Sequence, residues 1–530
     1  MAEAVLFQMR RGGLISALIL SMFFLGIWLR LLAWRQTETL RVEKDVVNGF
    51  YWGGEAVFEG RKLAGNSAAQ DSWVSFFKGY FALYDQVKGD ACENHYHLDY
   101  PPLRLLVMSL WANHELEKPA DAGVGRPEDV KPLLLFNLSC EVTTAVGIFL
   151  LVRSWLAGAK TSSRWLRGIG AERRGWLCGM AAACVAWLEP SLILDAHAWP
   201  QWDVWCLPFF LFAALSASTG RWLCCGCLLA FGAMFKGQLL IVAPFFVMWP
   251  AAEKQWANVS RVLAGFSATV AIVASPWLLR HPSACFSVIG ATAAFCALLL
   301  TRELPNKKTW LCGFFAAATL VAGILGHGSF AWAETGFLYG AEEYPYVVVG
   351  RCYNLPALLK YLASLLEEAR PAHDFGGAQV AAPKHMHSHA VIILIWISRL
   401  IYMGALWLCA CGASRLARNR DPRILIALAT PWLLMFALLA QIHERYLMWG
   451  AVVSATALGV NARLSLIHFL FSAASSVMIV HVMLIDKGIT ADLPLIHFLD
   501  QTTPWGSLLV LLGVGIYLWE SCSERRLGLR

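Results

Sequence analysis

Long apolar segments alternate with short polar ones along the chain. A helix needs roughly 20 apolar residues to cross the hydrocarbon core of a bilayer, and segments near that length recur many times. Their residues are apolar on every face, which favours helices over the alternating strands of a membrane barrel. We predict an all-α polytopic membrane protein with about 14 transmembrane helices. The predicted spans are 13–34, 133–153, 175–194, 202–218, 220–235, 238–251, 259–279, 284–301, 309–327, 389–412, 424–441, 446–461, 464–485 and 504–520.

The positive residues of the short loops give the chain a predicted orientation. Cytoplasmic loops of membrane proteins carry an excess of Lys and Arg. With the N-terminus in the cytoplasm, the inner loops are rich in both residues. The short outer loops then carry only Lys236, Arg280, Arg445 and Lys487. The alternation continues along the whole chain and supports this sidedness.

Two outer segments are long, and we interpret residues 1–530 as a single membrane domain with two extended non-cytoplasmic loops at 35–132 and 328–388. Leucines at helical spacing over 355–369 share one face, which predicts a juxtamembrane helix on the membrane surface. A second short helix is predicted over 101–113, because consecutive prolines favour a helix start.

Composition agrees with this class of protein. The chain is 58% hydrophobic and 15% charged, with a net charge of +7 that fits basic inner loops better than nucleic-acid binding. Its 15 cysteines lie mostly inside apolar segments and are interpreted as small hydrophobic residues. The first apolar run lacks a cleavage site and is expected to remain as a helix.

Four polar signatures occur at the ends of predicted spans, all on the outer side: 98–103 (Leu-Asp-Tyr-Pro-Pro-Leu), 195–203 (Asp-Ala-His-Ala-Trp-Pro-Gln-Trp-Asp), 236–238 (Lys-Gly-Gln) and 441–446 (Gln-Ile-His-Glu-Arg-Tyr). Ionisable groups beside hydrocarbon are costly and tend to mark functional pathways. Their convergence on one face predicts an active site at the bilayer surface.

The acids of the first outer loop are candidates for a general base. Asp45 lies near the membrane surface, just before a Tyr-Trp pair, where it could deprotonate an acceptor hydroxyl. Asp71, Asp85 and Asp90 compete for the same role. Asp99 has two interpretations: it caps the helix that follows, or its cap fixes the floor of a substrate cavity.

The second signature suggests a sugar site. Carboxylates and aromatic rings together can bind a sugar, through hydrogen bonds to hydroxyls and stacking on apolar ring faces. The polar members of this signature are Asp195, His197, Gln201 and Asp203.

The remaining signatures supply cations. Lys236, His443 and Arg445 could hold a lipid-linked phosphate, since Arg grips phosphate through paired hydrogen bonds and Lys acts as a point charge. The alternative is an ion pair with Glu444 or Asp195 that holds helices together. A His run at 385–389 favours a solvated segment over a metal site.

With these residues in view, the chain resembles the polytopic GT-C glycosyltransferases that use lipid-phosphate sugars. It is most similar to the dolichyl-phosphate-glucose glucosyltransferases of asparagine-linked glycosylation. Asp45 precedes Trp52 by the spacing of the family's first acidic element, although Lys44 replaces its Gly. The other elements of the family correspond to 98–102, 195–203, 236–238 and 442–445, with Asp203 in place of an Asn.

This resemblance implies an inverting transfer of glucose or mannose from a polyprenyl-phosphate donor to a glycan, lipid-linked or other acceptor, without a metal or other cofactor. It implies Asp45 as catalytic base and Lys236, His443 and Arg445 around the donor phosphate. The implied sugar and acceptor pocket contains Asp99, Tyr100, Asp195, His197, Gln201, Asp203, Gln238 and Glu444.

Two other functions remain open. A transporter or lipid-linked sugar flippase would place ionisable groups near the bilayer midplane, often in two related halves. A receptor or scaffold would not require acids and cations to meet. The expected partners are the lipid bilayer, the lipid-linked sugar and its acceptor. A prokaryotic plasma membrane is preferred over the endoplasmic reticulum, because no retrieval tail is evident.

Overall fold

The computed structural model of the chain describes residues 2–65, 72–86, 98–116, 124–157, 170–279, 305–338, 347–349, 351–367, 380–381, 388–486 and 494–523. The predicted span 284–301 lies outside these residues, as do Asp71, Asp90, His385 and His387. Contacts divide the chain into two compact units. The first comprises Met1–Gln36, Leu138–Trp199 and Tyr346–Arg530, and the second comprises Thr37–Asn137 and Pro200–Pro345.

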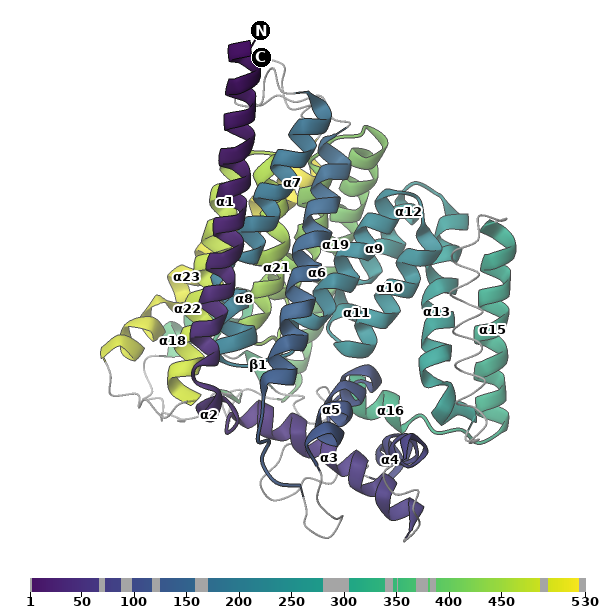
Figure 1. Cartoon of the computed structure of the whole chain (residues 1–530). Helices are drawn as coiled ribbons and strands as arrows, with labels where there is room; N and C mark the ends of the chain where they lie inside the picture. Colours follow the sequence, from purple (N-terminus) through teal and green to yellow (C-terminus); the bar gives the residue numbers. More distant parts are fainter. Residues whose placement is uncertain are drawn as a thin grey trace. The chain divides into compact units, whose positions relative to one another are not determined.

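The first unit is built around helix α20 (Ile424–Leu438), which is buried along almost its whole length. Helices α19, α21 and α23 pack against it. Its other elements are α1 (Ala2–Trp34), most of α6 (Lys131–Leu156), α7 (Ala171–Trp187), α8 (Pro190–Ile193), the π-helix η3 (Leu194–Ala198), α18 (Leu355–Glu367), α19 (Ser388–Arg418), η6 (Glu444–Tyr446), α21 (Leu447–Ser454), η7 (Ala455–Gly459), α22 (Ala462–Asp486) and α23 (Pro494–Cys522) (Figure 1). Two short strands, β1 (Val347–Val349) and β2 (Val380–Ala381), pair antiparallel.

The second unit contains a row of apolar helices in which α9, α10, α13 and α15 pack side by side (Figure 1). Helices α3, α4 and α5 form a compact group, and α5 also contacts α10. The elements are α2 (Thr37–Leu40), α3 (Lys44–Ala64), α4 (Trp73–Gln86), α5 (Pro102–Glu115), η4 (Asp203–Cys206), α9 (Leu207–Ser218), α10 (Trp222–Phe235), α11 (Leu239–Val242), α12 (Pro244–Ala252), α13 (Trp256–Leu279), α15 (Pro305–Leu325), α16 (Ala331–Ala333) and the π-helix η5 (Glu334–Leu338).

Glycine allows helices α3 and α4 to cross closely. A Cβ added at Gly60 would lie 2.3 Å from the carbonyl oxygen of Ser75, and one at Gly79 would lie 2.1 Å from that of Ala56. Only residues without a side chain fit such a crossing. This contact fixes the group that carries Asp45 and the 98–103 signature.

Seven described helices are long and apolar enough to cross a membrane, or eight if the bent pair α7 and α8–η3 counts as one span. This is consistent with an integral, all-helical membrane protein. The predicted spans at 202–218, 220–235, 238–251 and 424–441 correspond to shorter apolar helices, and 446–461 divides into α21 and η7. The number 14 therefore stays a prediction. The predicted short helices are present as α5 and α18.

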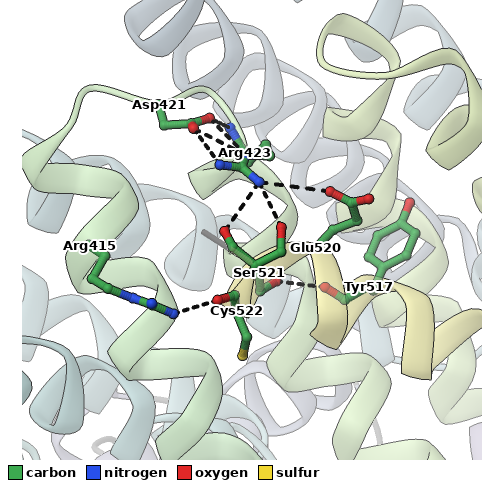
Figure 2. Close-up of polar contacts among 8 residues, drawn as sticks. Arg415, Asp421, Arg423, Tyr517, Glu520, Ser521 and Cys522 are labelled. Carbon is green, nitrogen blue, oxygen red and sulfur yellow. Dashed lines mark hydrogen bonds and ion pairs between the residues drawn. The ribbon is translucent and has the colours of Figure 1, made fainter. Parts of the chain in front are cut away.

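A cluster of charged side chains binds the C-terminal end of helix α23 (Figure 2). The Arg423 guanidinium donates from Nε and Nη2 to the carboxylate of Asp421, and from Nη1 to the Ser523 hydroxyl at 2.9 Å and the Ser523 carbonyl at 3.3 Å. Arg415 donates to the Cys522 carbonyl at 2.5 Å. The last carbonyls of a helix lack partners within it and carry partial negative charge, so arginines stabilise this end. We call Arg415, Asp421, Arg423 and Glu520 the Arg423 cluster.

Candidate functional site

Asp45 lies in the first turn of helix α3, and its half-buried carboxylate is held by a residue far away in sequence. The side-chain amide of Gln201 donates to Asp45 Oδ2 at 2.5 Å. Asn137 positions Gln201 by donating to its backbone carbonyl at 2.9 Å, and Trp205 Nε1 donates to Asn137 Oδ1 at 2.6 Å. These hydrogen bonds set the direction of a carboxylate that keeps access to solvent.

Gln201 has unused hydrogen-bonding capacity. The residue is fully buried, and within the described residues its Oε1 atom has no hydrogen-bond partner. Such an orphaned buried acceptor is costly, and a ligand hydroxyl would relieve the cost. The amide can therefore hold Asp45 with one end and accept a hydrogen bond from a ligand with the other.

The 98–103 signature forms an extended turn that is held from helix α4. The hydroxyls of Tyr84 and Tyr80 donate to the carbonyls of Tyr100 and Pro102, at 2.6 and 2.7 Å. Arg104 lies over the Tyr100 ring, with its Cζ atom 3.7 Å from the centroid. The turn is thus fixed by its backbone, and both tyrosines are buried donors.

Asp99 does not cap helix α5, which corrects one prediction. The N-cap residue is Pro101 and makes no side-chain capping bond, with Pro102 in the first turn. The two prolines occupy the positions that an Asp cap would need, so the half-buried Asp99 precedes the cap in extended chain.

The charges of Asp99 and Asp45 both act on the Tyr100 hydroxyl. Burial raises the pKa of the Tyr100 hydroxyl; Arg104 opposes this effect, and the two carboxylates Asp99 and Asp45 add to it. Asn48, one turn after Asp45 on helix α3, donates to the same hydroxyl at 2.9 Å. Both acids therefore lie around one tyrosine.

Lys236 follows the last residue of helix α10 and forms an ion pair with Asp203. Both side chains are buried, at 4% and 0% exposure. The partner of Lys236 is therefore Asp203, and not the Glu444 or Asp195 of the predicted alternative. Gln238 is half-buried and is the N-cap residue of helix α11. Because Gln201 and Asp203 are two residues apart, the Lys236 ion pair lies close to the Asp45 contact.

The remaining candidates belong to the first unit, because the boundary between units falls within the second signature. Asp195 and His197 are completely buried in η3. Trp34 Nε1 donates to His197 Nδ1 at 2.9 Å, and His197 Nε2 lies 3.1 Å from Glu141 Oε2. An indole N–H can only donate, so Nδ1 accepts and the ring proton lies on Nε2, directed at Glu141. His197 is therefore held as one neutral tautomer.

Glu141 also binds Arg30, whose Nε lies 2.5 Å from the same oxygen. Both side chains are almost completely buried, in helices α6 and α1. This pair was not predicted, although a charged residue lies inside each of two predicted spans. Asn137 was also missed, since it resembles an ordinary residue within a span.

The 441–446 signature contacts the second signature within the first unit. Arg445 lies over the Trp199 ring at 5.3 Å from its centroid. His443 is about half exposed, and its Nδ1 lies 4.0 Å from Glu444 Oε2, whose side chain is buried. Gln441 adopts a left-handed backbone with φ of 60°. Such strain in a non-glycine residue is frequent at functional sites.

The structure thus brings the candidates together in two groups. In the second unit, Asp45, Asp99, Tyr100, Gln201, Asp203 and Lys236 lie around neighbouring contacts. In the first unit, 195–199 meets 441–446. Asp85, the competing acid that the structure describes, is exposed and accepts a hydrogen bond from Ser329.

Two other features of the described residues bear on ligands. No group of three or more His, Cys, Asp or Glu side chains among them could hold a metal ion. A shallow surface hollow lies at the start of helix α7, lined by Gly170, Ala171, Glu172, Arg173 and Trp176, and contains none of the candidates.

The chain was also compared with known proteins. No family model matches it, and no match was found to a curated protein sequence.

Proposed function

We propose that this protein is a membrane glycosyltransferase that transfers a hexose from a polyprenyl-phosphate donor on the non-cytoplasmic side. The observation that carries the proposal is the contact of Asp45 with Gln201, residues 156 positions apart. A partly buried carboxylate beside a buried acceptor that has no partner among the described residues suits the deprotonation of a hydroxyl.

In this mechanism the acceptor hydroxyl donates to Asp45 and attacks the anomeric carbon of the sugar. Asp45 takes the proton as the new C–O bond forms, and the bond from the anomeric carbon to the phosphate oxygen breaks. The polyprenyl phosphate leaves with the electron pair of that bond. Gln201 orients Asp45, so that the proton acceptor is in place before the substrate binds.

Three cationic side chains of the signatures are candidates for binding the leaving phosphate. His443 and Arg445 are kept as the phosphate contacts that the resemblance implies; His443 is about half exposed, and Arg445 lies over the Trp199 ring. Lys236 would need to exchange Asp203 for the phosphate. Separating a buried ion pair leaves a charge without its partner, which disfavours that exchange. Lys236 is therefore assigned first to holding Asp203.

The test is a scan of donors with purified protein in liposomes. Polyprenyl-phosphate glucose and polyprenyl-phosphate mannose are supplied with a lipid extract that contains acceptor glycans, and free polyprenyl phosphate is measured. We expect release with one of the two sugars that depends on the acceptor. Absence of release with both donors would contradict the proposal.

A second function, proton-coupled transport, is favoured by one observation: a buried acid at the break between helices α7 and α8. Glu189 Oε2 lies 4.0 Å from His468 Nε2, and both side chains are buried. His468 Nδ1 lies 3.0 Å from the Ala451 carbonyl, which can only accept. The ring proton is then on Nδ1, so Nε2 and the carboxylate need a further proton to attract one another.

Glu141, another buried acid that lies beside a histidine, gives less support to transport. A proton added to His197 Nδ1 would oppose the Trp34 indole donor, so this histidine is poorly suited to carry protons. Liposomes loaded with a pH-sensitive dye would distinguish the two functions. Transport predicts proton movement that depends on substrate and is lost in Glu189→Gln. Glycosyl transfer predicts no proton movement and unchanged polyprenyl phosphate release in that variant.

A further inference from the structure

A second polar cluster of the first unit surrounds Asp500, near the start of helix α23. Arg351 Nε lies 3.7 Å from Asp500 Oδ1, and His481 Nε2 lies 3.4 Å from the same oxygen. The His481 side chain is buried, whereas Arg351 is 30% exposed and Asp500 is 45% exposed. None of these residues belongs to the four signatures.

This cluster adjoins the 441–446 signature. The Cys352 thiol donates to the Ile442 carbonyl at 3.2 Å, so the residues beside them, Arg351 and His443, belong to adjoining segments. The Asp500 cluster therefore lies beside the 441–446 signature.

Positive charge is in excess around this signature. Arg399 Nη2 donates to Gln441 Oε1 at 3.2 Å, which adds a third arginine to Arg351 and Arg445. Only Glu444 and Asp500 oppose these three arginines among the groups named here.

Arg351 also has an unused donor. Within the described part of the chain its Nη1 atom is buried and has no hydrogen-bond partner. Its contact with Asp500 uses Nε and, at 3.7 Å, is longer than a hydrogen bond. A guanidinium presents several N–H groups in a fork that matches phosphate oxygens. Arg351 is therefore incompletely satisfied where an anion would complete it.

We propose that Arg351 binds a phosphate monoester, acting with His443 and Arg445, and that Asp500 holds the guanidinium in position when the site is empty. The identity of this phosphate as the headgroup of the lipid donor or product rests on the proposed function. The binding itself does not, because it can be measured without any transfer.

The first experiment measures binding of polyprenyl phosphate to the full chain in nanodiscs. Arg351→Gln should weaken binding at least about 10-fold. Asp500→Asn should leave binding unchanged or tighten it, because it removes the competing carboxylate. Arg418→Gln, which changes an exposed arginine of the same unit, serves as control and should have no effect.

Opposite effects of the Arg351 and Asp500 variants on polyprenyl phosphate binding distinguish a phosphate-binding arginine from a structural ion pair. If both variants weaken binding to the same degree, the pair only supports the fold and the proposal is overturned. Unchanged binding in Arg351→Gln also overturns it. Arg351→Lys should restore binding in part, since Lys keeps the charge but loses the paired geometry.

The source of the phosphate is tested by competition with phosphatidic acid and with inorganic phosphate. Displacement by both supports a general phosphate monoester site, and displacement by neither supports a site that also requires the polyprenyl chain. Failure of the wild-type protein to bind any of the three overturns the proposal. If binding behaves as expected but no donor releases its sugar, the proposed function fails and the binding site remains.

Discussion

The Asp45 contact and the Arg423 cluster both join polar side chains from distant parts of the chain, but they differ in how completely those groups are satisfied. Arg423 is almost fully buried and directs every guanidinium nitrogen at an acceptor, from Asp421, Ser523 or Glu520. Figure 2 shows its contacts with Asp421 and Glu520. At the Asp45 contact, Gln201 Oε1 is buried without a partner among the described residues. A complete hydrogen-bond network stabilises the fold. An incomplete one beside a partly buried acid leaves a polar group that a ligand can bind.

The comparison predicts that the two regions respond oppositely to substitution. Asp45→Asn should reduce polyprenyl phosphate release by about 100-fold or more, the usual contribution of a general base. Its melting temperature should stay close to that of the wild type, since Gln201 can still bond to the new amide. Release assays and thermal melts of the same preparation check both expectations.

The matched control is Asp85→Asn, which changes an exposed acid of the same predicted outer segment, 35–132. It should retain its activity. Full activity in Asp45→Asn, or an equal loss in both variants, would remove Asp45 from the role of base.

The Arg423 cluster should show the reverse behaviour. Arg423→Ala leaves Asp421 and the end of helix α23 without their partner, at a cost of about 3 kcal/mol. We expect a lower melting temperature, with activity per folded molecule unchanged. If Arg423→Ala lost activity and kept its stability, a fully hydrogen-bonded cluster would also serve function, and the comparison of the two regions would fail.

A smaller effect is expected at the turn that carries Tyr100. Tyr84→Phe removes the donor to the Tyr100 carbonyl and should cost about 1–3 kcal/mol, because the carbonyl stays buried. Tyr80→Phe is the matched variant, since Tyr80 bonds the carbonyl of Pro102. Thermal melts measure both, and no change in either would contradict the account of this turn.

The same tyrosines predict a pH dependence of stability. Burial raises the pKa of Tyr80 and Tyr84 above the ordinary value of about 10. A raised pKa in the folded state means that the contribution to stability is complete below pH ~10 and falls as the pH rises beyond it. The melting temperature of Tyr84→Phe should therefore approach that of the wild type in strongly alkaline solution.

The sequence predicted much of the local structure. Consecutive prolines indicated helix α5, and leucine spacing indicated helix α18. The same prolines excluded Asp99 as a cap, which the sequence analysis did not take into account. The apolar segments at 238–251 and 446–461 are helical but change helix type or break inside, at α11–α12 and α21–η7, and composition does not reveal where an apolar segment does so.

Tertiary partners were beyond the reach of the sequence. Nothing in the spacing indicated that Lys236 would pair with Asp203, or that Gln201 would hold Asp45. Arg30 and Glu141 were predictable in principle, since a buried charge inside a span requires a partner. Both residues lie inside predicted spans, whereas the four polar signatures lie at span ends.

The most direct test of Asp45 as a proton acceptor is the pH dependence of transfer in Gln201→Glu. A second carboxylate at 2.5 Å would disfavour ionisation of Asp45, so the acidic limb of the rate profile should move to higher pH by about one unit or more. Gln201→Met, which removes the donor without adding charge, should shift it less. A profile that superimposes on the wild type, or that falls equally at every pH, would contradict the account.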